Sequence, residues 1–138
     1  MSSAGVTGLT DERVVNENTP CHPQDTYESS KYNAEKMVEQ GINNCTVVVL
    51  RPTNVIDDSN PGVLMMPIRN GWRDRCLVLL KGGELAHIIH AEDVADAALY
   101  FTETRLERPE CYIVSCDQDS RNSYSGLWML FNEYRLQG

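Results

Sequence analysis

The sequence has few positive charges and no run of basic residues. Its 12 Lys and Arg residues are outnumbered by 20 Asp and Glu, which gives a net charge of −8. Nucleic acids and anionic membrane surfaces attract proteins through a basic field, so neither is an expected partner. No apolar stretch reaches the roughly 20 residues that cross a bilayer, and no signal peptide is recognisable. We therefore expect a cytoplasmic location.

The cysteines are not spaced in the pattern of a disulfide-bonded protein. An odd number of thiols without regular spacing and without a CxxC motif predicts neither paired disulfides nor a zinc site. Cys21 and His22 are adjacent, yet the remaining histidines are far away in the sequence, so we interpret this pair as part of a loop. No metal is expected. The five cysteines are Cys21, Cys45, Cys76, Cys111 and Cys116.

The content that remains predicts a layered α/β domain. Apolar runs bounded by turn residues alternate between helical and extended patterns, and the run at 45–51 is β-branched without alternation, as in a strand buried on both faces. Such alternation favours a mainly parallel, doubly wound sheet. Because a parallel strand needs neighbours, we expect a single partial, Rossmann-like domain over residues 1–138. The expected helices cover 27–41, 64–72, 91–104 and 123–136, and the expected strands 45–51, 76–80, 87–90 and 112–115.

The first helix combines a phenol and an ammonium on one face. Asp25 or Thr26 can cap its start, and Gly41 is the expected stop. Residues four apart share a helical face, so Tyr27 and Lys31 continue into the apolar stripe of Ala34 and Val38, with Met37 beside it. A buried lysine is costly unless it is paired. The alternative is structural: Tyr27 anchors the helix while Lys31 reaches solvent.

Four short motifs occur in order along the chain. They are SSAGVTG at 2–8, YESSK at 27–31, RPTNV at 51–55 and HIIHAEDVA at 87–95. Together they resemble the extended short-chain dehydrogenase/reductases, the group that contains NAD-dependent sugar-nucleotide epimerases and dehydratases. The resemblance covers residues 2–101 and thins toward the C-terminus.

The resemblance implies a role for each matching residue. Tyr27 would be the catalytic acid or base, and Lys31 would lower its pKa and bind the cofactor ribose. Ser3 is the better match for the hydroxyl that hydrogen-bonds the reacting oxygen, with Ser2 as the alternative. The implied cofactor is NAD or NADP, and the implied substrate is a small molecule with a hydroxyl or carbonyl group, such as a nucleotide sugar. The implied cofactor contacts are Tyr27, Lys31 and Pro52, and the implied substrate contacts are Ser2, Asn54 and His90.

The chain departs from the family pattern at several positions. It has no glycine-rich GxxGxxG turn, which in this family holds the cofactor pyrophosphate at a helix N-terminus. Ala4 and Gly5 replace the acidic pair of the dehydratases, which disfavours dehydration. Many sugar-nucleotide enzymes carry an arginine at a position that corresponds to Ala86 or His87 here. The absence of this arginine leaves a carbonyl reductase of the same superfamily as an alternative.

Two interpretations follow. The first is the C-terminal part of an NAD(P)-dependent epimerase or carbonyl/alcohol oxidoreductase, in which the isolated chain is expected to be inactive because most of the cofactor cleft is missing. The second is a catalytically inactive fragment that acts as an oligomerising or partner-binding module. In either case we expect a homodimer, because an open parallel sheet edge is adhesive. A strand-end arginine such as Arg51 is expected to pair with a local carboxylate.

Overall fold

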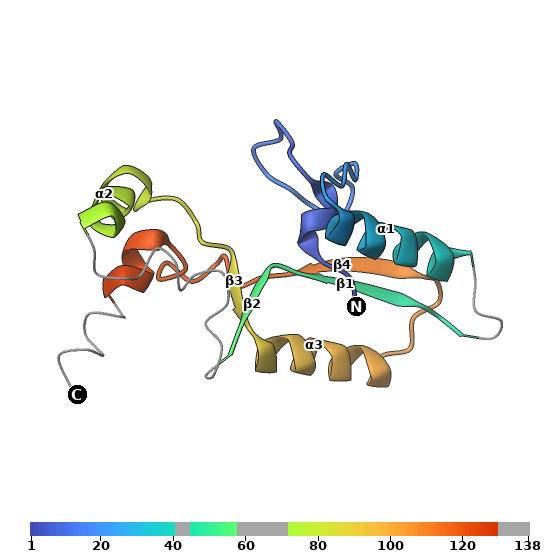
Figure 1. Ribbon diagram of the computed structural model, residues 1–138. Coiled ribbons are helices and arrows are strands. Elements are labelled where there is room, and N and C mark those ends of the chain that lie inside the picture. Colours follow the sequence, from blue (N-terminus) through green and yellow to red (C-terminus); the bar gives the residue numbers. More distant parts are fainter. Residues whose placement is uncertain (41–44, 58–71, 130–138) are drawn as a thin grey trace. The chain divides into compact units, whose positions relative to one another are not determined.

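The computed structural model describes residues 1–40, 45–57 and 72–129, which form an α/β fold with parallel strand pairs (Figure 1). They divide into two compact units, Met1–Thr53 with Glu92–Val114 and Asn54–Ala91 with Ser115–Gly138. The elements in chain order are η1 (Ala4–Thr7), α1 (Thr26–Glu39), β1 (Val48–Pro52), β2 (Asn54–Ile56), α2 (Trp72–Lys81), β3 (Ile88–His90), α3 (Ala91–Glu103) and β4 (Glu110–Val114).

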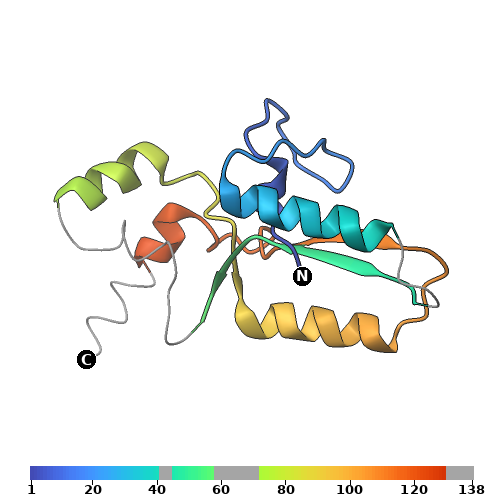
Figure 2. The ribbon, with the colours of Figure 1, turned by 45° about the vertical axis from the view of Figure 1, so that its right-hand side comes forward.

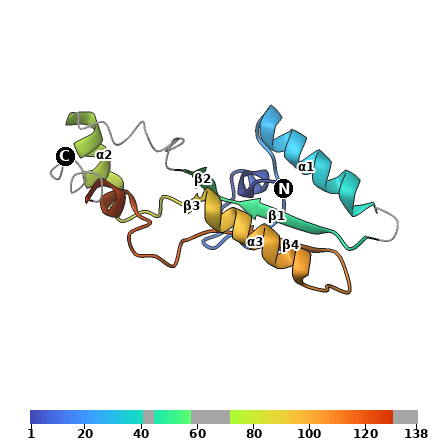
Figure 3. The same ribbon diagram turned by 90° about the horizontal axis from the view of Figure 1, so that it is seen from below.

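The first unit is a sheet covered by a helix on each face. Strands β1 and β4 pair in parallel, in a register that runs from Val48 opposite Glu110 to Pro52 opposite Val114. Helix α1 lies on one face of this pair and α3 on the other (Figures 2 and 3). This arrangement confirms the expected doubly wound, partial Rossmann-like fold.

Side-chain alternation along the strands assigns each face its contacts. On one face, the Tyr112 ring stacks on Phe101 of α3 with ring centroids 4.6 Å apart. Leu50 is opposite Tyr112 in the register and is 6% exposed, so it belongs to the same face. Arg51, the next residue, therefore faces α1.

Helix α1 begins where the sequence predicts. Asp25 Oδ1 accepts a 2.7 Å hydrogen bond from the backbone N–H of Glu28, which satisfies one of the free donors of the first turn. Glu28 in the first turn and Lys36 in the last complement the helix dipole. The helix ends at Glu39, and the predicted stop at Gly41 lies outside the described residues.

The N-terminal segment lies beside β1. The backbone N–H of Ser2 donates to the carbonyl of Leu50 at 2.8 Å, and η1 follows directly. Gly8 ends η1 with a φ of 63°, and a Cβ at this position would lie 1.9 Å from the His22 carbonyl oxygen. Only glycine fits this close approach and backbone conformation. The turn thereby fixes where the loop toward α1 begins.

The second unit is built around the parallel pair β2 and β3. The Asn122 amide extends this pairing, because its Nδ2 donates to the Ile88 carbonyl at 2.9 Å and its Oδ1 accepts from the Ile88 N–H at 3.1 Å. Asn122 itself is 3% exposed. The apolar core of this unit consists of Ala86 and Ile88 with Ile56, Tyr124 and Leu127 packed against them.

Most expected elements are present, and one is wrong. The predicted strand at 76–80 lies inside α2 instead. Its apolar run CLVLL has no alternation, and such a run cannot be told from a buried helix by periodicity alone. Leucine and the adjoining arginines favour helix, and Val78 is its only β-branched member.

The other boundaries shift by a few residues. The strand expected at 45–51 begins at Val48, and the one expected at 112–115 is β4. The expected helix at 91–104 and the extended piece at 87–90 are α3 and β3. The helix expected at 64–72 lies outside the described residues except for Trp72, and of the helix expected at 123–136 the structure describes 124–129 as helical. The single partial domain over 1–138 stays a prediction.

Candidate active site

Tyr27 and Lys31 lie on one face of α1. The Lys31 ammonium is 5.5 Å from the centroid of the Tyr27 ring and lies over its face. Tyr27 is 57% exposed, whereas Lys31 is partly buried. A cation over an exposed aromatic ring contributes roughly 0.5–1 kcal/mol. The pair is therefore preorganised in the first turns of the helix, with the phenol accessible from solvent.

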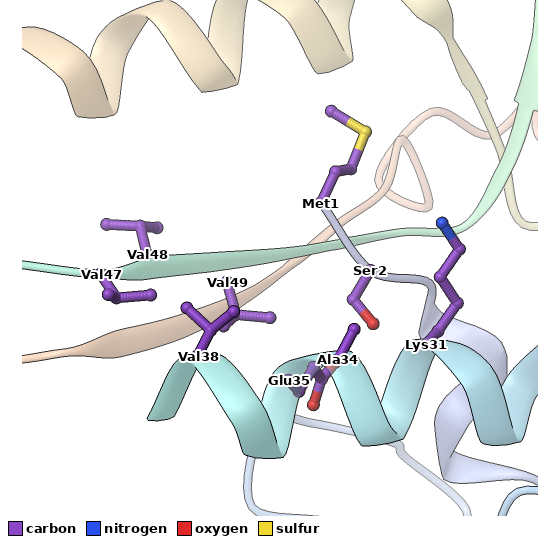
Figure 4. A pocket seen from close by; sticks show the side chains of 9 residues that line it. All are labelled: Met1, Ser2, Lys31, Ala34, Glu35, Val38, Val47, Val48 and Val49. Atoms are coloured by element: carbon purple, nitrogen blue, oxygen red, sulfur yellow. The ribbon is translucent and has the colours of Figure 1, made fainter. Parts of the chain in front are cut away.

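The same face borders a cavity between α1 and β1. The cavity measures about 80 Å³ and receives the side chains of Lys31 and Ser2 (Figure 4). Lys31, Ala34 and Val38 of the predicted stripe line this cavity, whereas Tyr27 and Met37 do not and are 57% and 74% exposed. The lining residues are Met1, Ser2, Lys31, Ala34, Glu35, Val38, Val47, Val48 and Val49.

The two serines differ in their surroundings. Ser3 is partly buried, and its Oγ accepts a 3.2 Å hydrogen bond from the Gly5 N–H as the N-cap of η1, which leaves the hydroxyl proton free to donate elsewhere. Ser2 is 7% exposed, and its Oγ has no hydrogen-bond partner among the described residues. The Ser2 side chain points toward α1 (Figure 4). Ser3 is thus the more accessible hydroxyl.

A second tyrosine–lysine pair follows on the same helix. Tyr32 and Lys36 repeat the spacing, with the Lys36 ammonium 5.2 Å from the Tyr32 ring centroid. Lys36, however, forms an ion pair with Glu39 at 2.7 Å, whereas Lys31 has no carboxylate partner within the described part of the chain. Only Lys31 borders the cavity. The second pair is an internal comparison for the first.

Glu35 of α1 and Arg51 of β1 form a buried ion pair beneath this face. Arg51 donates from Nε and Nη2 to the two Glu35 carboxylate oxygens, at 2.9 and 2.7 Å. Burial is the largest single influence and would raise the pKa of Glu35. The hydrogen bonds and charge of Arg51, with smaller contributions from other neighbouring groups, together hold that pKa below its ordinary value of 4.5. The same hydrogen bonds raise the pKa of Arg51.

The sequence predicted a carboxylate partner for Arg51 but did not identify Glu35. The available signal was spacing, because Glu35 lies four residues after Lys31 and thus on the same helical face. An acidic residue within an apolar stripe requires a buried partner of opposite charge, and Arg51 at the strand end provides it.

The remaining predicted site residues are divided between the two units. Pro52 is buried at the end of β1. In the second unit, the Asn54 side-chain amide donates a hydrogen bond to the Ala86 carbonyl at 3.1 Å. This hydrogen bond links β2 to the segment that precedes β3. His90 is partly buried at the end of β3. His87 adopts a left-handed φ of 51°, and its Nδ1 lies 2.8 Å from Asp117 Oδ2.

Neither a metal-binding cluster nor a bilayer-spanning helix is found among the described residues. Within residues 1–40, 45–57 and 72–129, no group of three or more His, Cys, Asp or Glu side chains is placed to hold a metal ion. In the same ranges, no helix combines the length and the apolar character that a bilayer crossing requires.

A parallel strand pair with a helix on each face is consistent with a partial Rossmann-like, NAD(P)-binding fold. The chain matches the family model of the male sterility protein over residues 7–96. It therefore belongs to this family, an NAD(P)-binding family of the extended short-chain dehydrogenase/reductase type. No curated protein and no solved structure matches the chain.

Proposed function

We propose that the chain supplies the proton-transfer residues of an NAD(P)-dependent oxidoreductase that acts on the hydroxyl or carbonyl group of a small molecule. The observation that carries this proposal is the Tyr27–Lys31 pair at 5.5 Å, on the helical face that borders the cavity. The family match supports the cofactor class.

In this proposal the Tyr27 phenol exchanges a proton with the substrate oxygen. Its exposure leaves the oxygen open to a substrate, and the nearby Lys31 ammonium stabilises negative charge that develops on it. The Ser3 hydroxyl, held by the Gly5 N–H, donates to the same substrate oxygen. The nicotinamide of a bound cofactor supplies or accepts the hydride.

The residues present fit one part of that cofactor. Lys31 and Tyr27 offer an ammonium and a phenol to the hydroxyl groups of a ribose, and the lack of a carboxylate partner for Lys31 among the described residues leaves its donors available. Pro52, buried at the end of β1, stays a proposed cofactor contact. No glycine-rich turn in the sequence is suited to hold a pyrophosphate. We therefore assign these residues to the nicotinamide ribose alone.

For the substrate, we favour a carbonyl or alcohol over a nucleotide sugar. The position at which an arginine would bind a sugar diphosphate is occupied by Ala86 or His87. The His87 side chain does not replace that arginine, because it is already paired with Asp117. Ser2, Asn54 and His90 remain proposed substrate contacts. Epimerisation, which uses the same tyrosine chemistry, is the second possibility within this class.

The test is transfer of deuterium from NADH or NADPH deuterated at nicotinamide C4. The chain would be incubated at high cofactor concentration with a set of aldehydes and ketones, and the products examined by mass spectrometry. Tyr27→Phe should reduce deuterium incorporation by about 10²–10⁴-fold, because it removes the proton donor. Tyr32→Phe, the matched control, should leave it unchanged. Deuterium incorporation that is equal for Tyr27→Phe and the unmodified chain would contradict the proposal.

A second candidate is a catalytically inactive module that associates with a second copy of itself. Large apolar side chains on the two helices of the first unit support it: Met37 on α1 is 74% exposed, and Leu99 and Tyr100 on α3 are 62% and 64% exposed. Burying such side chains contributes roughly 1.5–3 kcal/mol each. Light scattering over a dilution series should then show a dimer that dissociates, and a monomer at every concentration would rule this candidate out.

A further inference from the structure

Two thiols lie near the buried Arg51 guanidinium. Arg51 Nη2, which already binds Glu35, also lies 3.3 Å from the Cys21 sulfur. Cys111 comes from β4: the register pairs it with Val49 and pairs Ile113 with Arg51. Alternate strand residues share a face, so Cys111 lies on the same side of the sheet as Arg51.

The loop that carries Cys21 is held against β4. Glu17 Oε1 accepts a 2.9 Å hydrogen bond from the Ile113 N–H, next to the strand position of Cys111. Farther along the same loop, the Thr19 hydroxyl donates to Glu12 at 2.7 Å, and Thr19 is 4% exposed. The loop is therefore anchored to β4 two residues from Cys111.

Both cysteines influence the ionisation of Arg51. Burial raises the pKa of the Cys111 thiol, and the Arg51 charge opposes that rise. Hydrogen bonds to Glu35 are the largest cause of the raised pKa of Arg51, and the charges of Cys111 and Cys21 add to it.

Arg51 also keeps one donor unused. Its side chain is 7% exposed, and Nη1 has no hydrogen-bond partner among the described residues. A buried N–H without an acceptor is costly, and an oxidised or anionic sulfur is an acceptor that would satisfy it. A cationic donor beside partly buried sulfur is the environment in which reactive cysteines occur.

We propose that Cys21 and Cys111 form a thiol-oxidation site whose substrate is a hydroperoxide. The Cys21 thiolate attacks the terminal peroxide oxygen, the O–O bond breaks, and sulfur loses two electrons to become a sulfenic acid. The hydroxide or alkoxide that leaves takes up a proton. The Cys111 thiolate then attacks the Cys21 sulfur, an S–S bond forms, and the displaced hydroxide is protonated to water.

The disulfide would join the loop to β4. Cys21 lies six residues before Tyr27, and the intervening segment leads directly into the Asp25 cap of α1. Oxidation would thus restrain the entry to the Tyr27–Lys31 face. Cys45 and Cys76 are exposed and have no such partner among the described residues, so they serve as internal references.

The experiment treats the full chain with hydrogen peroxide, blocks the remaining thiols, and maps the products by mass spectrometry after tryptic digestion without reduction. A Cys116→Ser background removes the second thiol from the Cys111 peptide. We expect a crosslinked pair of peptides containing Cys21 and Cys111. Cys21 should be consumed about tenfold faster than Cys45, and urea should abolish this preference because it is imposed by the fold.

Two single-cysteine variants, Cys111→Ser and Cys21→Ser, test which of the two thiols is oxidised first. In Cys111→Ser, a dione that traps sulfenic acids should label Cys21, whereas in Cys21→Ser the dione should not label Cys111 at the same peroxide dose. Circular dichroism of each variant establishes that it is folded. Consumption of Cys21 no faster than Cys45, or oxidation of both thiols without the crosslink, would overturn the proposal.

Discussion

Arg51 of β1 donates two hydrogen bonds to Glu35 of α1, and the exposed fractions of the two side chains are only 7% and 2%. The pair joins the helix that carries Tyr27 and Lys31 to the strand that borders the cavity. A helix fixed at Glu35 has its preceding turn fixed as well, so the direction of Lys31 follows from this contact. The ion pair is thus the structural basis of the candidate active site.

Removing one partner of this pair should strongly destabilise the chain. Arg51→Ala leaves the Glu35 carboxylate buried without its counter-ion, which costs roughly 3–5 kcal/mol. Urea denaturation followed by circular dichroism measures the loss. The control is the double variant Glu35→Leu with Arg51→Met, in which no charge remains buried, and it should recover most of the stability. Equal stability of Arg51→Ala and the unmodified chain would contradict the role given to the pair.

The same pair should make stability fall in acid. The pKa of Glu35 in the folded chain lies below its ordinary value of 4.5. Its contribution is therefore fully present above the unfolded pKa and is lost as the pH falls through the folded value. Between about pH 5 and pH 3, Glu35→Gln should lose less stability than the unmodified chain. Urea titrations across this range would show parallel curves if Glu35 were not involved.

Gly8 should not tolerate a side chain. Alanine there would adopt a φ of 63° and place its Cβ 1.9 Å from the His22 carbonyl oxygen. Backbone strain of this kind costs about 1–3 kcal/mol before the clash is counted. Gly83→Ala is the matched control, because nothing lies within 4 Å of its added Cβ. Thermal unfolding of the two variants compares them directly, and similar midpoints would contradict the geometry of this turn.

The sequence predicted the parts of the fold that local chemistry decides. The Asp25 cap, the β-branched strand ending at Pro52 and the amphipathic α3 follow from short-range patterns, and all are present. The run at 76–80 was misassigned because a short apolar stretch has no period to distinguish helix from strand. Propensity then decides in favour of α2.

At the candidate site, spacing identified the face but not its long-range contacts. The positions of Tyr27 and Lys31 follow from helical periodicity alone. The burial of Glu35 depends on Arg51, which is 16 residues away, and the contact of Cys21 with Arg51 spans 30 residues. No local pattern encodes such pairs, because they arise only when the strand and the helix pack together.

We expect the chain by itself to bind NAD or NADP weakly. Lys31 and Tyr27 offer contacts to a ribose, but a pyrophosphate requires several converging backbone donors, for which the sequence has no glycine-rich turn. Calorimetric titration measures the affinity. Stoichiometric binding with a dissociation constant on the order of micromolar would show that other residues form a phosphate site.

The assignment of Tyr27 and Lys31 to the cofactor face is tested most directly by locating where the cofactor contacts the chain. In a titration with NADP followed by nuclear magnetic resonance, weak binding still shifts the signals of the residues in contact. We expect shifts at Tyr27, Lys31 and Ser3 that grow without saturating at micromolar cofactor. We expect none at Tyr32 and Lys36, although this pair repeats the same spacing with a ring distance of 5.2 Å. Shifts at Tyr32 and Lys36 with none at Tyr27 and Lys31 would contradict the assignment of the active face.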